Sequence, residues 1–150
     1  EILIGLVGSE MCIRDRAVVD NVGNYQNVLR NVYWKNSSLQ PLMPFIDNKA
    51  PKKVKGLKFL SVDGDNVLFW TKPKGKGWKD EAVKYVVYGF DGGEKINLSD
   101  ASKIKAITTE CFYKTSPTDF SKSKGVYVVT ALDKLSNESK GKKINVKKSK

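Results

Sequence analysis

Residues 125–133, GVYVVTALD, decide the fold class of this chain, because they form a short run of β-branched and aromatic residues bounded by Gly and Asp. In a strand, alternate members of this run would share one face, and one of the two faces would be buried. NVLFW at 66–70 and KYVVYGF at 84–90 divide between two faces in the same way. From Val54 onward, short apolar runs are separated by clusters of Gly, Asp, Asn and Ser, which predicts successive strands joined by turns. We therefore expect a mainly β chain folded as an antiparallel β-sandwich.

The strands predicted around this stretch account for most of the remaining sequence. They are GLKFLSV (56–62), DNVLFWTK (65–72), VKYVVYGF (83–90), EKINL (94–98), KIKAIT (103–108), CFYKT (111–115), GVYVVTALD (125–133) and KKINVK (142–147). The alternation places the structural core at Leu68, Trp70, Tyr85, Val87, Tyr127, Val129 and Ala131. It places Lys84, Val86, Tyr88, Val128 and Thr130 on the opposite, outward face.

A different period occurs before the strands. Residues 24–35, NYQNVLRNVYWK, predict one amphipathic helix, which Asn24 is expected to cap. Its apolar stripe consists of Tyr25, Val28, Leu29, Val32 and Tyr33. The two prolines of LQPLMPFID (39–47) predict an extended path, and DNKAPKKVKG (47–56) predicts a linker.

The N-terminal residues have a separate origin in this interpretation. Residues 6–15, LVGSEMCIRD, resemble one translated frame of a transposase adapter used to prepare sequencing libraries. We therefore assign residues 1–16 to an adapter-derived scar and exclude them from the fold. This interpretation implies a natural protein that extends further upstream, and it leaves Cys111 as the native cysteine.

Composition excludes several kinds of site. The chain has no histidine and two cysteines, so a zinc site of the usual ligands and a Ser-His-Asp triad are excluded. Its longest apolar runs are too short to span a bilayer. The carboxylates among the predicted strands sit in turns, where Asp bonds its own backbone, so no catalytic residue is expected among Asp63, Asp65, Asp80, Glu81, Asp91, Glu94 and Asp100. We expect no metal and no cofactor.

The net charge of +11, from 27 Lys and Arg against 16 Asp and Glu, first suggests a nucleic-acid partner. The excess lies in residues 50–150, which hold 22 lysines, 11 acidic residues and no arginine. Nucleic-acid readout usually depends on the planar fork of arginine, so this composition argues against nucleic acid. A solvated lysine-rich surface is the favoured interpretation, and binding of an anionic polymer stays open.

The strand residues resemble a known module. Leu68-Phe69-Trp70, Tyr85-Val86-Val87-Tyr88 and Tyr127-Val128-Val129-Thr130-Ala131 are similar to the L-x-W, Y-x-V and Y-x-V-x-A strands of fibronectin type III domains. The resemblance implies a fibronectin type III or immunoglobulin-like sandwich preceded by the helix. It also implies that Tyr127 is the corner tyrosine, whose hydroxyl fixes the chain at the end of the sheet.

A narrower resemblance covers nearly all of residues 24–140. The helix, LQPLMPFID, YVVYGF, GEKINLSDASKIKAIT and YVVTALDKLSNES occur in the order of the C-terminal end of bacterial glycosyl-hydrolase-like family 10 proteins, known in Bacteroidetes as large surface or periplasmic lipoproteins. In that family a (β/α) barrel carries the hydrolase site, and its last helix leads into a fibronectin-like module.

This resemblance implies a domain plan and a function. Residues 17–46 would be the last barrel helix and an extended segment, 47–56 a linker, 57–140 the sandwich and 141–150 a basic tail. The chain would be a non-catalytic accessory module of a periplasmic, cell-surface or secreted glycoside hydrolase-like protein. Its partner would be the barrel of the same parent chain, docked on the helix stripe. The family's catalytic positions have no counterpart here.

Two other functions stay open. A stand-alone carbohydrate-binding module would stack polysaccharide on exposed aromatics, with Trp78 as the main candidate and Tyr88 or Trp34 beside it. A binder of anionic polymers would use the lysine-rich surface and lose affinity steeply with salt.

Overall fold

The computed structural model describes residues 19–62, 65–75, 77, 80–116, 118–121 and 124–147. The chain divides into two compact units between Asn36 and Ser37. Among the described residues, the first unit holds the helix and the second holds the strands. No helix in the described part of the chain combines the length and apolarity needed to cross a bilayer.

The helix of the first unit is built from three consecutive pieces. A 3₁₀ turn, η1 (Val22–Asn24), leads into α2 (Tyr25–Val28) and then into the wider π turn η2 (Leu29–Tyr33). Asn24 has a left-handed backbone with φ of 65° and makes no capping bond. The predicted cap at Asn24 was therefore wrong. The Asn21 Oδ1 accepts from the Gln26 N–H at 2.9 Å, a contact that spans the 3₁₀ turn.

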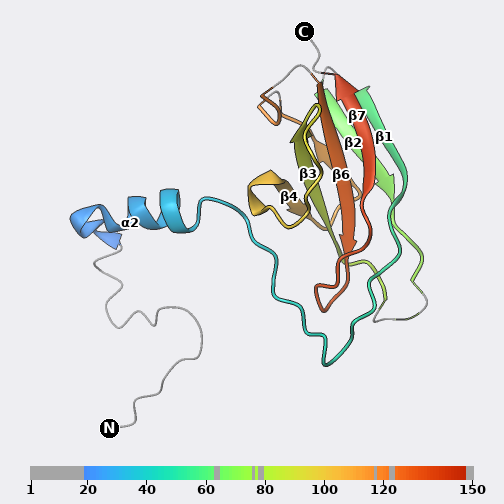
Figure 1. The fold of residues 1–150 in the computed structure, drawn as a ribbon, viewed down its shortest axis with the longest axis horizontal. Coiled ribbons are helices and arrows are strands. Elements are labelled where there is room, and N and C mark those ends of the chain that lie inside the picture. The colour runs from blue at the N-terminus through green and yellow to red at the C-terminus, as the bar shows by residue number, and fades with distance from the viewer. Residues whose placement is uncertain are drawn as a thin grey trace. The chain divides into compact units, whose positions relative to one another are not determined.

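The second unit consists of two antiparallel sheets (Figure 1). One sheet has the order β1-β2-β5, with β1 (Lys55–Val62), β2 (Asp65–Thr71) and β5 (Phe112–Lys114). The other has the order β4-β3-β6-β7, with β4 (Ile104–Thr108), β3 (Lys84–Asp91), β6 (Lys124–Leu132) and β7 (Lys142–Lys147). The predicted mainly β fold with two packed antiparallel sheets and one helix is confirmed.

The larger core lies between the two sheets. Its buried side chains come from both, with Leu68 and Trp70 on β2 facing Tyr85 and Val87 on β3. Trp70 and Tyr85 meet edge to face, with ring centroids 5.5 Å apart. Tyr127, Val129 and Ala131 on β6 complete this layer. Burial of so many large side chains supplies the main free energy of folding.

The outer face of the four-stranded sheet is also buried, which corrects the prediction of an outward face. Val86, Tyr88, Val128 and Thr130 are each 3% exposed or less, and all but Thr130 belong to a second apolar cluster. Leu39, Leu98, Ile104 and Val126 pack against that cluster. A sheet buried on both faces carries near-continuous apolar runs, which is the pattern of YVVYGF.

Two further predictions differ from the structure. EKINL at 94–98 is an irregular connection whose Leu98 covers the second cluster. The predicted linker includes Val54, which is buried in the main core. In both cases tertiary contacts override the local composition. The predicted strand KKINVK is present as β7, which pairs with β6 along its whole length inside the stretch assigned to a basic tail.

Candidate functional site

The connection between β2 and β3 forms an open depression of about 620 Å³ lined by Lys72, Pro73, Lys74, Gly75, Gly77 and Glu81. Lys72 Nζ and Glu81 Oε1 lie 2.7 Å apart, and both side chains are about half exposed. The hydrogen bond and the charge of Lys72 lower the pKa of Glu81. Trp78, the main aromatic candidate, lies outside the described residues.

Tyr88, the second aromatic candidate, cannot contact a carbohydrate. Its side chain is 0% exposed in the second cluster, so its proposed role as a surface platform is wrong. Its hydroxyl donates to Glu138 Oε1 at 2.8 Å, and the Thr130 hydroxyl donates to the same oxygen at 2.6 Å. Burial and the bond to Glu138 raise the pKa of Tyr88. This hydroxyl is therefore a structural donor.

The polar segment after β6, DKLSNES, is also occupied by structural bonds. Asp133 is buried and accepts from the backbone N–H groups of Leu135 and Asn137 at 2.8 and 2.9 Å. Its other oxygen accepts from the Asn137 side-chain amide at 2.9 Å. Ser139 Oγ accepts from the Ala131 N–H at 2.9 Å. These contacts shape the turn between β6 and β7.

A second carboxylate organises the opposite connection, between β5 and β6. Asp119 Oδ2 accepts from the Tyr127 hydroxyl at 2.6 Å, from the Tyr113 hydroxyl at 3.1 Å and from the Ser116 N–H at 3.0 Å. Burial and Asp119 together raise the pKa of both tyrosines. The Tyr127 hydroxyl therefore bonds to a side-chain carboxylate in the connection before β6, whereas a tyrosine corner of the sandwich domains bonds to backbone.

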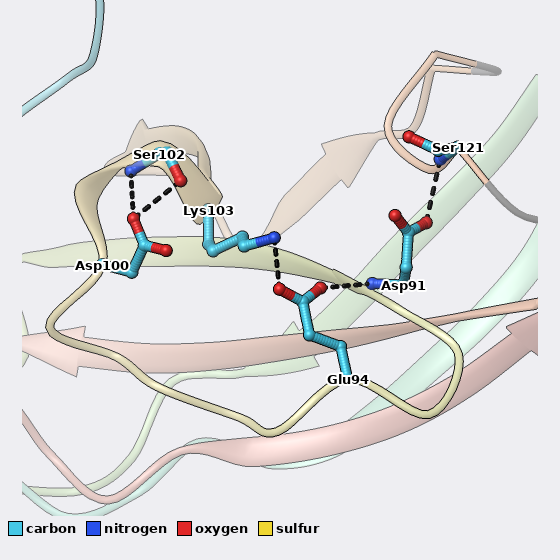
Figure 2. A network of polar contacts seen from close by, with 6 residues as sticks. All are labelled: Asp91, Glu94, Asp100, Ser102, Lys103 and Ser121. Carbon is cyan, nitrogen blue, oxygen red and sulfur yellow. Dashed lines mark hydrogen bonds and ion pairs between the residues drawn. The ribbon is translucent and has the colours of Figure 1, made fainter.

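The carboxylates of the β3–β4 connection form a third network (Figure 2). Glu94 pairs with Lys103 through Oε1 and accepts the Asp91 N–H at 3.0 Å through Oε2. Asp91 Oδ1 accepts the Ser121 N–H at 2.8 Å. Asp100 Oδ1 accepts both the backbone N–H and the hydroxyl of Ser102. The connection is therefore held at both ends.

These geometries bear on glycosidic chemistry, which needs a carboxylic acid with a raised pKa to protonate the leaving group. Lys103 and the Asp91 N–H lower the pKa of Glu94, and Ser102 lowers that of Asp100. Glu94 and Asp100 therefore favour the ionised form, and each accepts a hydrogen bond from a backbone N–H. Within the described residues, no group of three or more acidic, Cys or His side chains is placed to hold a metal ion.

The helix stripe is mostly exposed within its unit. Tyr25 and Val28 are each 40% exposed, Val32 67% and Tyr33 73%, whereas Leu29 is buried at 6%. Trp34, the other aromatic named by sequence, is 67% exposed. Large exposed apolar side chains grouped on one helix mark an interaction surface more often than isolated ones do.

Comparison with known proteins points to a glycosidase relative. No family model matches the chain. It is 31% identical over 114 residues to glycosyl hydrolase YngK of Bacillus subtilis, a match that covers 76% of the chain and 22% of YngK. The spore cortex lytic enzyme SleM of Clostridium perfringens is structurally similar over 65% of this chain and 28% of that one, with a TM-score of 0.47 and 13% identity. The chain therefore spans about a fifth of YngK and is distantly related to that part of a glycosyl hydrolase.

Proposed function

We propose that this chain is a non-catalytic accessory module of a glycoside hydrolase-like protein, in which it packs against the catalytic barrel and holds it in position. The single observation that carries the proposal is the 31% identity to glycosyl hydrolase YngK over 114 residues. The exposed stripe of Tyr25, Val28, Val32 and Tyr33 supplies an apolar surface for the barrel. The parent protein would act in the periplasm, at the cell surface or outside the cell.

Polar side chains of the sandwich are engaged in hydrogen bonds within the fold, which supports a structural role for this unit. The side chains that could do proton chemistry, such as Glu94, Asp119 and Glu138, hold connections together. A catalytic carboxylate would have to give up such a bond to reach a substrate. Structural use of these groups favours an accessory role.

We also propose that the sandwich is of the fibronectin type III kind. The seven strands divide three to four, and strands from both sheets enclose one core. The bond from Tyr127 to Asp119 fixes the connection before β6 as a tyrosine corner does, with a carboxylate in place of the backbone acceptor. Both observations support this assignment, in which the module is a rigid spacer beside the barrel.

A chimera tests the accessory role. The segment of YngK that matches this chain is deleted in one protein and replaced by residues 17–150 of this chain in another. We expect the deletion to lower the thermal midpoint and the glycosidase activity of YngK, and the chimera to restore both. A chimera as unstable and inactive as the deletion would contradict the proposal.

The docking surface is tested in the same chimera. Val32→Ser with Tyr33→Ser should remove most of the restored stability, since both side chains are largely exposed in the free chain. Gln26→Ser with Asn31→Ser on the same helix is the matched control and should leave the chimera unchanged. Equal effects of the two pairs would refute docking through the stripe.

Of the aromatics named for the carbohydrate-binding alternative, Tyr88 is buried and Trp34 is exposed, and Trp78 stays the main candidate. Binding of the chain to a glycan array, lost on Trp78→Ala, would favour that function. Retention of binding in Trp78→Ala would exclude Trp78 as the platform.

A further inference from the structure

One side of the sandwich concentrates lysine without acidic residues. β1 and β7 are edge strands of different sheets, and they lie side by side (Figure 1). Together they carry five exposed lysines, which we call the lysine edge: Lys55, Lys58, Lys142, Lys143 and Lys147. Neither strand contains Asp or Glu.

The lysine edge is not neutralised by the described part of the chain. The lysines with ion pairs to described carboxylates are Lys72, Lys103 and Lys114, all on other elements. In the β6–β7 ladder, Lys147 lies directly opposite Lys124, another exposed lysine. Like charges opposite each other in a ladder destabilise it, so a bound anion would relieve this repulsion.

The arrangement fits a linear polyanion. Lys143 and Lys147 lie on the same face of β7 and are separated by four residues of extended strand, about 13 Å. Positive charge repeated along a strand matches negative charge repeated along a polymer, and each neutralised charge releases counterions. Lysines on edge strands also prevent pairing with other chains, and β1 and β7 each serve that role in their own sheet. Binding of a polyanion requires in addition that the two neighbouring strands act as one surface.

We propose that the lysine edge binds an acidic polysaccharide whose carboxylate or sulfate groups recur along the chain. Lysine is a flexible point charge, suited to spaced single anions, whereas nucleic-acid readout favours the bidentate arginine absent from residues 50–150. The choice of polysaccharide over nucleic acid also rests on the proposed function, because an accessory module of a glycosidase would hold its substrate.

The test compares two triple variants of the full chain. Lys58→Gln, Lys142→Gln and Lys143→Gln remove charge from the lysine edge. Lys74→Gln, Lys84→Gln and Lys95→Gln remove three exposed lysines elsewhere and lower the formal net charge of +11 by the same amount. The probe is polygalacturonate, with neutral dextran and duplex DNA as comparisons, and circular dichroism checks the fold of each variant.

We expect the wild type to bind polygalacturonate but not dextran, with an affinity that falls steeply between about 50 and about 200 mM salt. The lysine-edge variant should bind at least about tenfold more weakly at the lower salt concentration and show a shallower salt dependence. The control variant should lose far less. Equal losses in both variants, or no binding by the wild type at low salt, would overturn the proposal.

The DNA comparison decides the class of polymer. Tighter binding to duplex DNA than to polygalacturonate at the same salt concentration would overturn the polysaccharide assignment in favour of a nucleic acid. This result would not change the outcome expected of the YngK chimera experiment, since that experiment measures thermal stability and glycosidase activity. The lysine edge and the accessory role can therefore fail separately.

Discussion

At the scale of single residues, Glu138 holds two hydroxyls that come from neighbouring strands. Its Oε1 accepts from Tyr88 on β3 and Thr130 on β6, beside the second apolar cluster. Bonds of a hydroxyl to a carboxylate are stronger than neutral ones, and a buried donor left without a partner is costly. The carboxylate therefore contributes more than either hydroxyl.

We expect Glu138→Ala to destabilise the chain by about 2–4 kcal/mol and Tyr88→Phe by about 1–2 kcal/mol. The first change leaves two hydroxyls without their acceptor, whereas the second leaves Thr130 still bonded. Urea unfolding of both variants and of the double variant measures this difference. A Tyr88→Phe cost equal to that of Glu138→Ala would show that the Thr130 bond contributes nothing.

Gly125 is required by a close approach. A Cβ atom there would lie 2.5 Å from three ring atoms of Phe120, and that ring packs on Tyr127 with centroids 4.6 Å apart. Because contact with Tyr127 limits movement of the ring, Gly125→Ala should cost about 1–3 kcal/mol by overpacking. Gly77→Ala, at a position with no atom within 4 Å, is the control and should change stability by less than about 0.5 kcal/mol. Thermal unfolding distinguishes them, and equal shifts would contradict the packing argument.

At the scale of elements, Asp119 connects the two sheets through a loop. It lies between β5 of one sheet and β6 of the other and binds a tyrosine on each. We expect Asp119→Ala to destabilise the chain by about 2–4 kcal/mol, because the hydroxyls of Tyr113 and Tyr127 lose their acceptor. Asp119→Asn keeps an acceptor oxygen and should cost clearly less. Guanidinium unfolding measures both, and equal costs would indicate that the loop does not depend on this acceptor.

The β3–β4 connection should respond to acid. The hydrogen bonds from Lys103 and from the Asp91 N–H hold the pKa of Glu94 below its ordinary value of 4.5. A carboxylate with a depressed pKa stabilises the folded state above its unfolded-state pKa and loses this contribution as the pH falls through its folded-state pKa. Folding is thus supported by Glu94 above about pH 4.5 and progressively less below it.

Glu94→Gln should therefore reduce the free energy of unfolding most above pH 4.5. The difference between wild type and variant should shrink as the pH is lowered further, which denaturant unfolding at a series of pH values measures. Lys103→Gln removes the partner and should shrink the same pH-dependent part. A difference that stays constant with pH would contradict this account.

At the scale of the whole molecule, both apolar clusters lie within the second unit. Their members run from Leu39 to Val146, and the units divide between Asn36 and Ser37. We expect a chain of residues 37–150 to fold and to unfold at nearly the same temperature as the full chain. Scanning calorimetry of both checks this. A large loss of stability on removing residues 1–36 would show that the helix stabilises the sandwich.

The sequence predicted the inter-sheet core well because that core depends on a local pattern. Period-two alternation in NVLFW and VYVVTALD marks which side chains share a face, whatever lies opposite. The same rule wrongly placed Tyr88 and Val128 on an outward face, because alternation gives no information about what covers the second face of the sheet. The continuous apolar run of YVVYGF was the available signal, because two-sided burial removes the polar positions.

The surroundings of the candidate site residues were harder to predict from the sequence. Tyr88 was assigned to the surface from its neighbours along the strand, but Leu39 and Leu98, distant in sequence, cover its cluster. The lysines of residues 50–150 looked scattered, because β1 and β7 are about eighty residues apart along the chain. In the folded sandwich, β7 is the edge of the four-stranded sheet and lies beside β1, the edge of the three-stranded sheet.

By itself, the sequence determined the strand segments other than EKINL, the faces that meet between the sheets and the excess of lysine, since each follows from local periodicity or composition. The tertiary structure alone decided that the four-stranded sheet is buried on both faces and that its hydroxyls bond to Glu138. It alone gathered Lys55 and Lys58 beside Lys142, Lys143 and Lys147. The physical reason is that burial and electrostatic potential depend on distance in space, which the packing of distant segments sets.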